Sequence, residues 1–343
     1  MRKLFVVLFL GATVTLVGCN TEQVNKQTDW APLKVNYQGT TASKIFAVKP
    51  PLSDARRALR VSTVPQGCLI VSSAVNVNGE QLITEQTSTN KSLWRTSKLY
   101  QQGMFVLEGT AAEVTKVNFK PIACDPSSTS EVLANDINVE MLVSDMPANP
   151  GIKVRFALSS AIAAEINVES LSWLIALELD LSVAVTNVEI INDAEIVMQS
   201  ATDISPLVNI LSMLKSKNDN TIDIVIGQCL KQHNAFGLHD LAGFTPRIPG
   251  GVGMADGIFV SRTNCDLPQS SPGTVNEIAR LTAHEIGHYL GLTHPIEANG
   301  TEDDLTSTDA NNLMHRIPLT ATAKGLTSEQ RKRMLAHPYV IEL

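Results

Sequence analysis

One short segment constrains the fold more than any other part of the chain, and it reads His284-Glu285-Ile286-Gly287-His288-Tyr289-Leu290-Gly291-Leu292-Thr293-His294. His284 and His288 are four residues apart, so on a helix their side chains lie on one face and can bind one ion. Gly291 favours a helix end in a left-handed turn, a conformation that glycine adopts at little cost. The chain can then turn back and bring His294 to the same ion. The segment therefore predicts a helix, a sharp turn and three imidazoles around one point.

The residue types in this segment indicate a catalytic zinc site. Neutral imidazoles are good zinc ligands, and three protein ligands leave one coordination position open, as in catalytic rather than structural zinc sites. Glu285 lies about 100° around the helix from His284, so it can reach a water at the metal without being a ligand. Zinc lowers the pKa of its water toward about 7, and Glu285 can then accept the proton as a general base. A domain that binds zinc without turnover is the alternative, and the presence of Glu285 argues against it.

This segment resembles the extended motif of the metzincin metallopeptidases, H-E-x-x-H-x-x-G-x-x-H followed by a methionine turn, and every fixed position matches. The candidate for the turn is Asn312-Leu313-Met314-His315. In the family the methionine lies beneath the metal as a hydrophobic floor and is not a ligand, and the resemblance implies this role for Met314. The Gly-Leu-x-His form and the Asn-Leu-Met turn are most similar to the pappalysin-like bacterial branch. The resemblance covers about residues 131–343 and implies one catalytic zinc ion, a mixed sheet and peptidase activity.

The sequence departs from several metzincin branches two residues after the methionine, where those branches place a tyrosine that assists at the oxyanion. This chain has Arg316 at that position. A positive charge near the metal could stabilise the developing oxyanion, so Arg316 could be an oxyanion helper. It could equally be a solvated surface arginine.

A glycine-rich loop over Gly250–Gly257 precedes a predicted strand over Ile258–Ser261. In metzincins the strand just before the active-site helix is an edge strand that lines the cleft. An extended peptide could then add to Ile258–Ser261 by main-chain hydrogen bonds. A merely flexible connection is the alternative for the loop.

Acidic residues gather between the third histidine of the motif and the methionine turn, where carboxylates could hold a structural calcium ion. They are Glu302, Asp303, Asp304 and Asp309. The spacing of an EF-hand is absent, so a solvated acidic loop is the favoured interpretation. The remaining histidines have no ligand spacing and are interpreted as structural; they are His233, His239, His315 and His337.

The N-terminal residues have the pattern of an export signal. Arg2 and Lys3 precede the apolar stretch Leu4–Val17, which is too short for a comfortable membrane span and fits a signal peptide. The stretch ends in Leu16-Val17-Gly18-Cys19, which resembles the lipobox of bacterial lipoproteins. We therefore expect a signal peptide over residues 1–18 and acylation of Cys19, which anchors the protein in the lipid bilayer of the outer membrane or cell surface. A plain secretory signal is the alternative.

Export also bears on the cysteines, because disulfides form in extracytoplasmic compartments. Without Cys19 four remain, and four cysteines allow three pairings. Pairing within domains is the simplest choice and predicts Cys68–Cys124 and Cys229–Cys265. Four buried thiols are the alternative. No two of these cysteines have C-x-x-C spacing, which argues against a cysteine zinc site.

The mature chain divides at a linker of Asp, Pro, Ser and Thr over residues 125–130. Residues 19–40 are a polar tether after the lipidated cysteine. Short strand patterns over 41–124 predict a small all-β sandwich, with strands at Ser43–Lys49, Ala58–Val64, Cys68–Val77, Met104–Gly109 and Val114–Lys120. The formal net charge of −7, without a basic run, and an aromatic content of 5% argue against a nucleic-acid-binding protein.

Helix and strand patterns alternate over 131–343, which predicts an α/β (α+β) domain with the metal-binding helix. The stretch Val168–Leu181 is ambiguous, because its first part has helical spacing and residues 177–185 alternate as in a strand. We interpret it as a helix that gives way to a strand between 177 and 185, and the strand continues to about Ile191. The other expected strands and helices are Ile152–Leu158, Pro206–Lys215, Thr221–Ile226, Gly257–Ser261, Val275–Leu290 and Thr327–His337.

Together these features predict a lipid-anchored, zinc-dependent endopeptidase that cleaves extracytoplasmic proteins, with Glu285 as general base. Two alternatives stay open. One is a non-catalytic, zinc-bearing binding or adhesion lipoprotein, and the other is a hydrolase of cell-wall peptides.

Overall fold

The structure of the chain is a computed structural model. The structure describes residues 31–32, 44–47, 56–64, 68–76, 81–83, 102–107, 114–122, 136–192, 195–198, 205–214, 220–234, 237–246, 248–251, 256–262, 273–296, 303, 305, 311–322 and 325–343. The predicted signal peptide, Cys19, nearly all of the tether and the linker over 125–130 lie outside these residues.

The first strands form two antiparallel sheets of four strands each, with the orders β1-β8-β3-β6 and β2-β7-β4-β5. Their bounds are β1 Ala31–Pro32, β2 Lys44–Ala47, β3 Arg56–Val64, β4 Cys68–Asn76, β5 Gln81–Ile83, β6 Gln102–Leu107, β7 Val114–Ile122 and β8 Asp136–Ser144. The five predicted strands are confirmed within a few residues, and the packing of the two sheets as a sandwich stays a prediction.

Strand β8 pairs with a strand from before the predicted linker. It follows the linker over 125–130, yet it pairs with β3 from Arg56–Ser144 to Val64–Asp136. The sheet pairing therefore crosses the boundary predicted between 124 and 131. The linker composition predicts an irregular segment, but it does not reveal whether the next strand returns to the same sheet.

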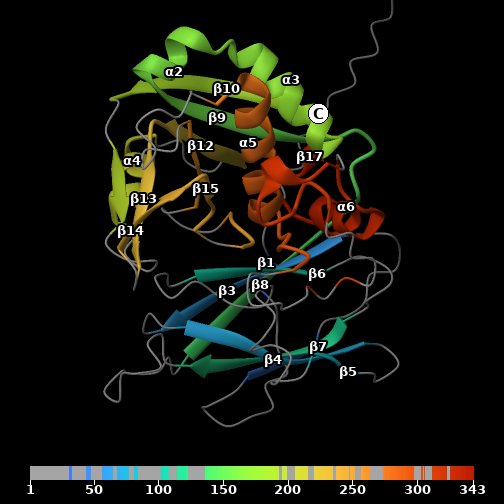
Figure 1. The fold of residues 1–343 in the computed structure, drawn as a ribbon. Coiled ribbons are helices and arrows are strands. Elements are labelled where there is room, and N and C mark those ends of the chain that lie inside the picture. The colour runs from blue at the N-terminus through green and yellow to red at the C-terminus, as the bar shows by residue number, and fades with distance from the viewer. Residues whose placement is uncertain are drawn as a thin grey trace, which may run out of the picture.

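The C-terminal part is built on a mixed six-stranded sheet with the order β10-β9-β12-β16-β15, and β17 pairs with the start of β9 (Figure 1). Strands β10, β9, β12 and β16 are parallel, whereas β15 and β17 are antiparallel to their neighbours. The bounds are β9 Pro150–Ser159, β10 Ser182–Ile191, β12 Thr221–Gly227, β15 Gly243–Phe244, β16 Ile258–Ser261 and β17 Ile341–Glu342. The predicted mixed sheet is confirmed.

The central strands β9, β12 and β16 are buried on both faces, which explains their continuous apolar runs. Phe156 and Leu158 of β9 pack in one core with residues of α3 (Val168–Leu179) and α5 (Val275–Tyr289). Ala157 points to the other face and packs with residues of α4 (Ser205–Met213). Figure 1 shows α2 (Ser160–Glu165), α3 and α5 on one side of the sheet and α4 on the other.

The ambiguous stretch is a helix followed by a strand, as predicted. Helix α3 ends at Asp180, whose left-handed backbone (φ 52°, ψ 46°) separates it from β10. Glu178, which interrupts the apolar stripe of α3, forms a half-buried ion pair with Arg280 of α5 at 2.7 Å. This ion pair allows a charged residue at a position where the helical pattern calls for an apolar one.

The predicted edge strand is wrong. Strand β16 lies between β12 and β15, and β15 pairs with it through Gly243–Val260 and Phe244–Phe259. The hairpin of β13 (Leu230–Asn234) and β14 (Gly237–Leu241) runs directly into β15. A strand of two residues has no periodicity to detect, and it forms because β16 offers it a free edge.

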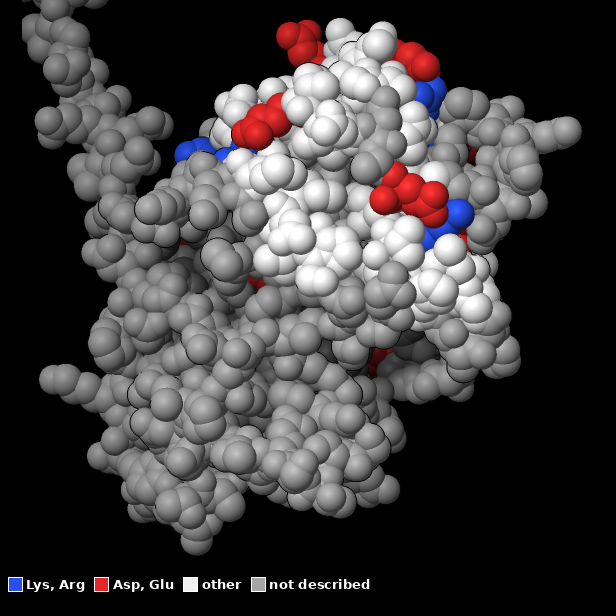
Figure 2. All heavy atoms as spheres, turned by 90° about the vertical axis from the view of Figure 1, so that its left-hand side faces the viewer, with Lys and Arg blue, Asp and Glu red and all other residues white. Residues whose placement is uncertain are grey.

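The remaining elements are β11 (Ile196–Met198), which pairs with β13, the 3-10 turn η2 (Pro318–Thr320) and helix α6 (Ser328–Leu335). No helix among the described residues is long and apolar enough to span a membrane. On the face in Figure 2, the described side chains are mostly uncharged, and acidic and basic groups lie close to one another. Such a face has no extended field of one sign.

Candidate metal centre

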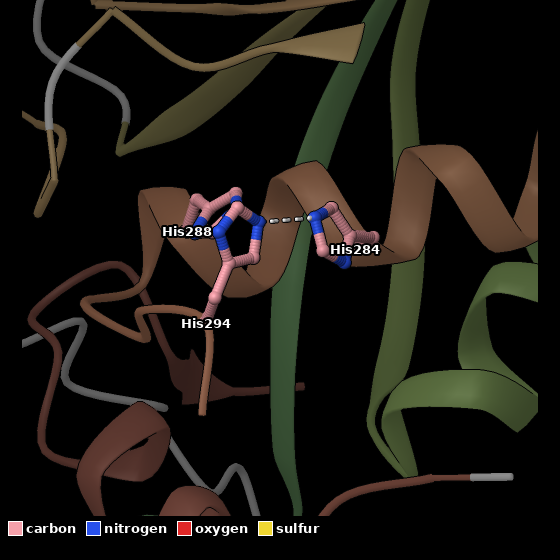
Figure 3. A group of neighbouring side chains, drawn as sticks. All are labelled: His284, His288 and His294. Carbon is pink, nitrogen blue, oxygen red and sulfur yellow. Dashed lines mark hydrogen bonds between the residues drawn. The ribbon is translucent and has the colours of Figure 1, made fainter. Parts of the chain in front are cut away.

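Helix α5 positions two of the three predicted ligands. Thr274 begins the helix with a capping box in which the Thr274 hydroxyl accepts from the Glu277 backbone amide and the Glu277 carboxylate accepts in return. The second half of the helix is buried on all sides, and His284 and His288 are only 3% and 6% exposed. Figure 3 shows both imidazoles on the same side of α5.

The turn after α5 positions the third ligand. Gly291 has a φ of 98°, which glycine adopts far more easily than other residues. The amides of Gly291 and Leu292 donate to the carbonyls of His288 and Gly287, each at 2.9 Å. The chain then reverses and brings His294 opposite the helix (Figure 3). The predicted glycine turn is confirmed.

The three imidazoles have the geometry of a metal site. His294 Nε2 lies 3.1 Å from His288 Nε2 and 3.3 Å from His284 Nε2. Tetrahedral zinc with ligand nitrogens at about 2.0–2.1 Å would place those nitrogens about 3.3 Å apart. Among the described residues, one cluster of side chains could hold a metal ion, and it consists of these three histidines. The donor set therefore fits zinc.

Backbone carbonyls fix the orientation of the two helical ligands. His284 Nδ1 lies 2.8 Å from Leu313 O, and His288 Nδ1 lies 2.8 Å from Leu292 O. A carbonyl only accepts, so Nδ1 carries the proton and Nε2 presents its lone pair to the metal position. Burial, followed by the nearby His288, lowers the pKa of His284 well below its usual value. His284 is therefore neutral at pH 7, the form that binds metal.

Glu285 is buried between α5 and β15, with 5% of its surface exposed. Thr245 donates from Oγ1 to Glu285 Oε2 at 2.6 Å, and the same hydroxyl lies 3.0 Å from the Glu285 carbonyl oxygen. Burial raises the pKa of Glu285 to about 8, although the Thr245 hydrogen bond acts in the opposite direction. The carboxyl group is thus suited to accept and release a proton near neutral pH.

The predicted methionine turn lies against the ligand helix. Met314 is fully buried, and its sulfur would lie 2.5 Å from a Cβ placed on Gly287. Leu313 of the same turn provides the carbonyl that orients His284. Asn312 closes the turn, since its Oδ1 accepts from the Met314 amide at 2.8 Å and its Nδ2 donates to Gln330 Oε1 at 2.8 Å.

Three residues of this site were not identified from the sequence. Gly287 is a variable position of the motif, but a glycine inside a helix often indicates close packing, and this signal could have pointed to it. Thr245 and Gly243 lie some forty residues before the motif, and no local pattern connects them to Glu285. Only the pairing of β15 with β16 brings them to the site.

The other predicted site residues lie away from this cluster or outside the described residues. Arg316 is exposed, and its role at an oxyanion stays a prediction. Asp303 accepts from the Leu305 amide at 3.1 Å, whereas Glu302, Asp304 and Asp309 lie outside the described residues. The calcium site is not supported, because the only potential metal ligands that cluster among the described residues are the three histidines.

The buried His337 contributes to packing, as expected for a structural histidine. Its Nε2 lies 3.2 Å from Gly250 O, and its ring packs against Tyr289 of α5. Cys229 is buried after β12 and Cys68 begins β4, but Cys124 and Cys265 lie outside the described residues. Both disulfides therefore stay predictions.

Comparison with known proteins agrees with this reading of the site. Residues 163–295 match the family model described as metallo-peptidase family M12B, Reprolysin-like, a range that includes α5 and all three histidines. No curated protein was found to match the sequence.

Several solved peptidase structures are similar at low sequence identity. A zinc-dependent peptidase from Methanocorpusculum labreanum is 12% identical, with 53% of this chain and 99% of that chain covered and a TM-score of 0.33. The archaemetzincin of Methanopyrus kandleri is 18% identical, with 55% and 88% covered and a TM-score of 0.29. Metalloproteinase-II of Bacteroides fragilis is 13% identical, with 69% and 65% covered and a TM-score of 0.35. Similarities this low carry no argument about function.

The family match and the three convergent imidazoles, taken together, support a zinc metallopeptidase domain in the C-terminal part of the chain.

Proposed function

We propose that this chain is a zinc-dependent endopeptidase of the metzincin type, close to the pappalysin-like bacterial branch, and that it hydrolyses peptide bonds of extracytoplasmic proteins. Two observations support the proposal: three oriented imidazoles converge with Nε2 separations of 3.1 and 3.3 Å, and the buried Glu285 directly follows the first of them on helix α5. A structural zinc site has no need of a buried carboxyl group that is not a ligand.

Each residue of the site has a defined part in this proposal. His284, His288 and His294 hold the zinc ion. When bound, zinc supplies a Lewis acid that polarises the scissile carbonyl group and activates a water molecule. Glu285 accepts the proton of the attacking water and passes it to the leaving amine. Met314 packs beneath the ligands, and Arg316 is a candidate for stabilising the oxyanion.

We infer the cellular location of the enzyme from its N-terminal segment. A signal peptide over residues 1–18 and acylation of Cys19 would hold the domain at the outer membrane or cell surface. Proteins and peptides outside the cytoplasm would then be its substrates. The strands that precede the catalytic domain would separate it from the bilayer or help to bind substrate.

Substitution of the general base tests the proposal. The purified full-length protein and its Glu285→Gln variant are loaded with zinc and compared in cleavage of a fluorescently labelled, unfolded casein. We expect equal zinc content and a loss of about 10²- to 10⁴-fold in kcat for the variant. Equal cleavage by both proteins would reject Glu285 as the base. Zinc binding without cleavage by the parent would favour the non-catalytic binding protein or a narrow substrate such as a cell-wall peptide.

A further inference from the structure

We propose that Thr245 is a positioning residue for Glu285, and that Gly243 makes room for the same carboxyl group. Neither residue belongs to the zinc-binding motif. The inference rests on the proposed peptidase function, since it concerns how the general base of that reaction is held.

Both residues come from the short edge of the sheet beside α5. Gly243 and Thr245 are two positions apart, so they face the same side of an extended chain. Phe244, between them, packs in the core on the α4 side of the sheet. Positions 243 and 245 therefore face α5, where Glu285 lies.

The Thr245 hydroxyl lies within hydrogen-bonding distance of two oxygens of Glu285. It donates to the carboxylate Oε2 at 2.6 Å and lies 3.0 Å from the Glu285 backbone oxygen. The shorter separation is typical of a hydroxyl that donates to a carboxylate. Thr245 and Glu285 are 8% and 5% exposed, so water competes little for this bond. The hydroxyl donates its one proton to Oε2, and this bond holds the carboxyl group at a fixed position on helix α5.

Gly243 provides the space that this arrangement needs. A Cβ at this position would overlap Oε1, Cδ and Cγ of Glu285, so the carboxyl group packs directly on the strand backbone. Oε2 thus lies against the Thr245 hydroxyl and Oε1 against Gly243. Strand β15 and the residue that follows it thus determine where the carboxyl group lies.

Three substitutions separate a hydrogen bond from simple packing. Thr245→Val keeps the shape and loses the hydroxyl, whereas Thr245→Ser keeps the hydroxyl and loses a methyl group. Thr282→Val is the matched control, because Thr282 is a buried threonine of α5 whose hydroxyl donates only to the Ile278 carbonyl at 2.7 Å. Gly243→Ala adds the overlapping methyl group. Each purified full-length variant is measured for zinc content, for kcat and KM on labelled casein, and by crystallography of the zinc-loaded form.

We expect all variants to bind the full amount of zinc. For Thr245→Val and Gly243→Ala, kcat should fall about 10- to 100-fold, and KM should not change. Thr245→Ser should recover most of what Thr245→Val loses, and Thr282→Val should match the parent. The crystal structures should show the Glu285 carboxyl group displaced in Thr245→Val and not in Thr245→Ser. A Thr245→Ser variant as impaired as Thr245→Val would overturn the inference, as would an undisplaced carboxyl group in Thr245→Val.

The crystallographic comparison also separates this inference from the proposed function. If the parent cleaves nothing, the peptidase proposal fails. The position of the Glu285 carboxyl group in Thr245→Val still decides whether Thr245 holds it.

Discussion

Burial acts in opposite directions on the two neighbouring residues His284 and Glu285. It lowers the pKa of the imidazole and raises that of the carboxyl group to about 8. In both cases the neutral form is favoured when no cation is near. A neutral imidazole is ready to bind metal, and a carboxyl group with a pKa near the working pH is ready to exchange a proton. The sequence motif identifies these two residues, but only their burial explains why their pKa values are shifted.

The Glu285 pKa predicts how the stability of the metal-free protein depends on pH. The folded-state pKa of about 8 is higher than the ordinary value of 4.5, so between these values the folded protein holds a proton that the unfolded chain has lost. The free energy of unfolding should therefore fall as the pH rises from about 5 to 8. Each pKa unit corresponds to about 1.4 kcal/mol, so the effect should reach a few kcal/mol.

Glu285→Gln isolates this contribution, because His284 is present in both proteins. Urea unfolding of the chelator-treated parent and variant, measured from pH 5 to 9, gives the difference in unfolding free energy. The parent should lose stability relative to the variant across this range. If the unfolding free energy of the parent, relative to that of the variant, stays constant or rises with pH, this would contradict the burial of an ionisable carboxyl group.

Helix α5 and its turn are the elements that the sequence predicts best. The capping box, the two histidines and the glycine turn depend on neighbours within a few residues, so local patterns are sufficient. Strand β15 is the opposite case, since it is two residues long and forms only by pairing with β16. For this reason Thr245 and Gly243 could not be linked to Glu285 in advance, and β16 was expected at the edge of the sheet.

The turn after α5 allows a test of how an element positions a ligand. Gly291→Ala places a side chain at a φ of 98°, which should cost about 1–2 kcal/mol of unfolding free energy. If the strain is relieved by a shift of the turn, His294 moves and zinc affinity should fall about 10- to 100-fold. Competition with a chromogenic zinc chelator measures this affinity.

Gly237→Ala is the matched control. Gly237 has a φ of 117° in the β13–β14 hairpin, and a Cβ there would meet nothing within 4 Å. A similar loss of stability without a loss of zinc affinity is expected. If both variants bound zinc as tightly as the parent, the turn would not be what positions His294.

Across the chain as a whole, the sequence predicts the two kinds of architecture but not which strands belong to each. Alternating short strands indicate the N-terminal sheets, and mixed helix and strand patterns indicate the C-terminal sheet. Strand β8 belongs to the first although it follows the linker. The pairing between residues 56–64 and 136–144 is a long-range contact, which the amino-acid composition does not predict.

The proposed anchor predicts a covalent lipid on Cys19. Bacteria that express the protein and grow with labelled palmitate should incorporate the label into the parent and not into Cys19→Ser, because serine lacks the thiol that is acylated. Several acyl chains give a firm anchor, whereas one chain binds only marginally. Label that persists in Cys19→Ser would contradict the lipoprotein assignment and favour a plain secretory signal.

In the proposed function, three histidines hold one zinc ion on which cleavage depends. A zinc titration of the chelator-treated full-length protein, with bound zinc and casein cleavage measured in the same samples, tests it most directly. We expect cleavage to rise in proportion to the filling of the site formed by His284, His288 and His294. The His294→Ala variant should show neither tight binding nor cleavage. Cleavage by zinc-free protein, or tight zinc binding by His294→Ala, would rule out this role for the three histidines.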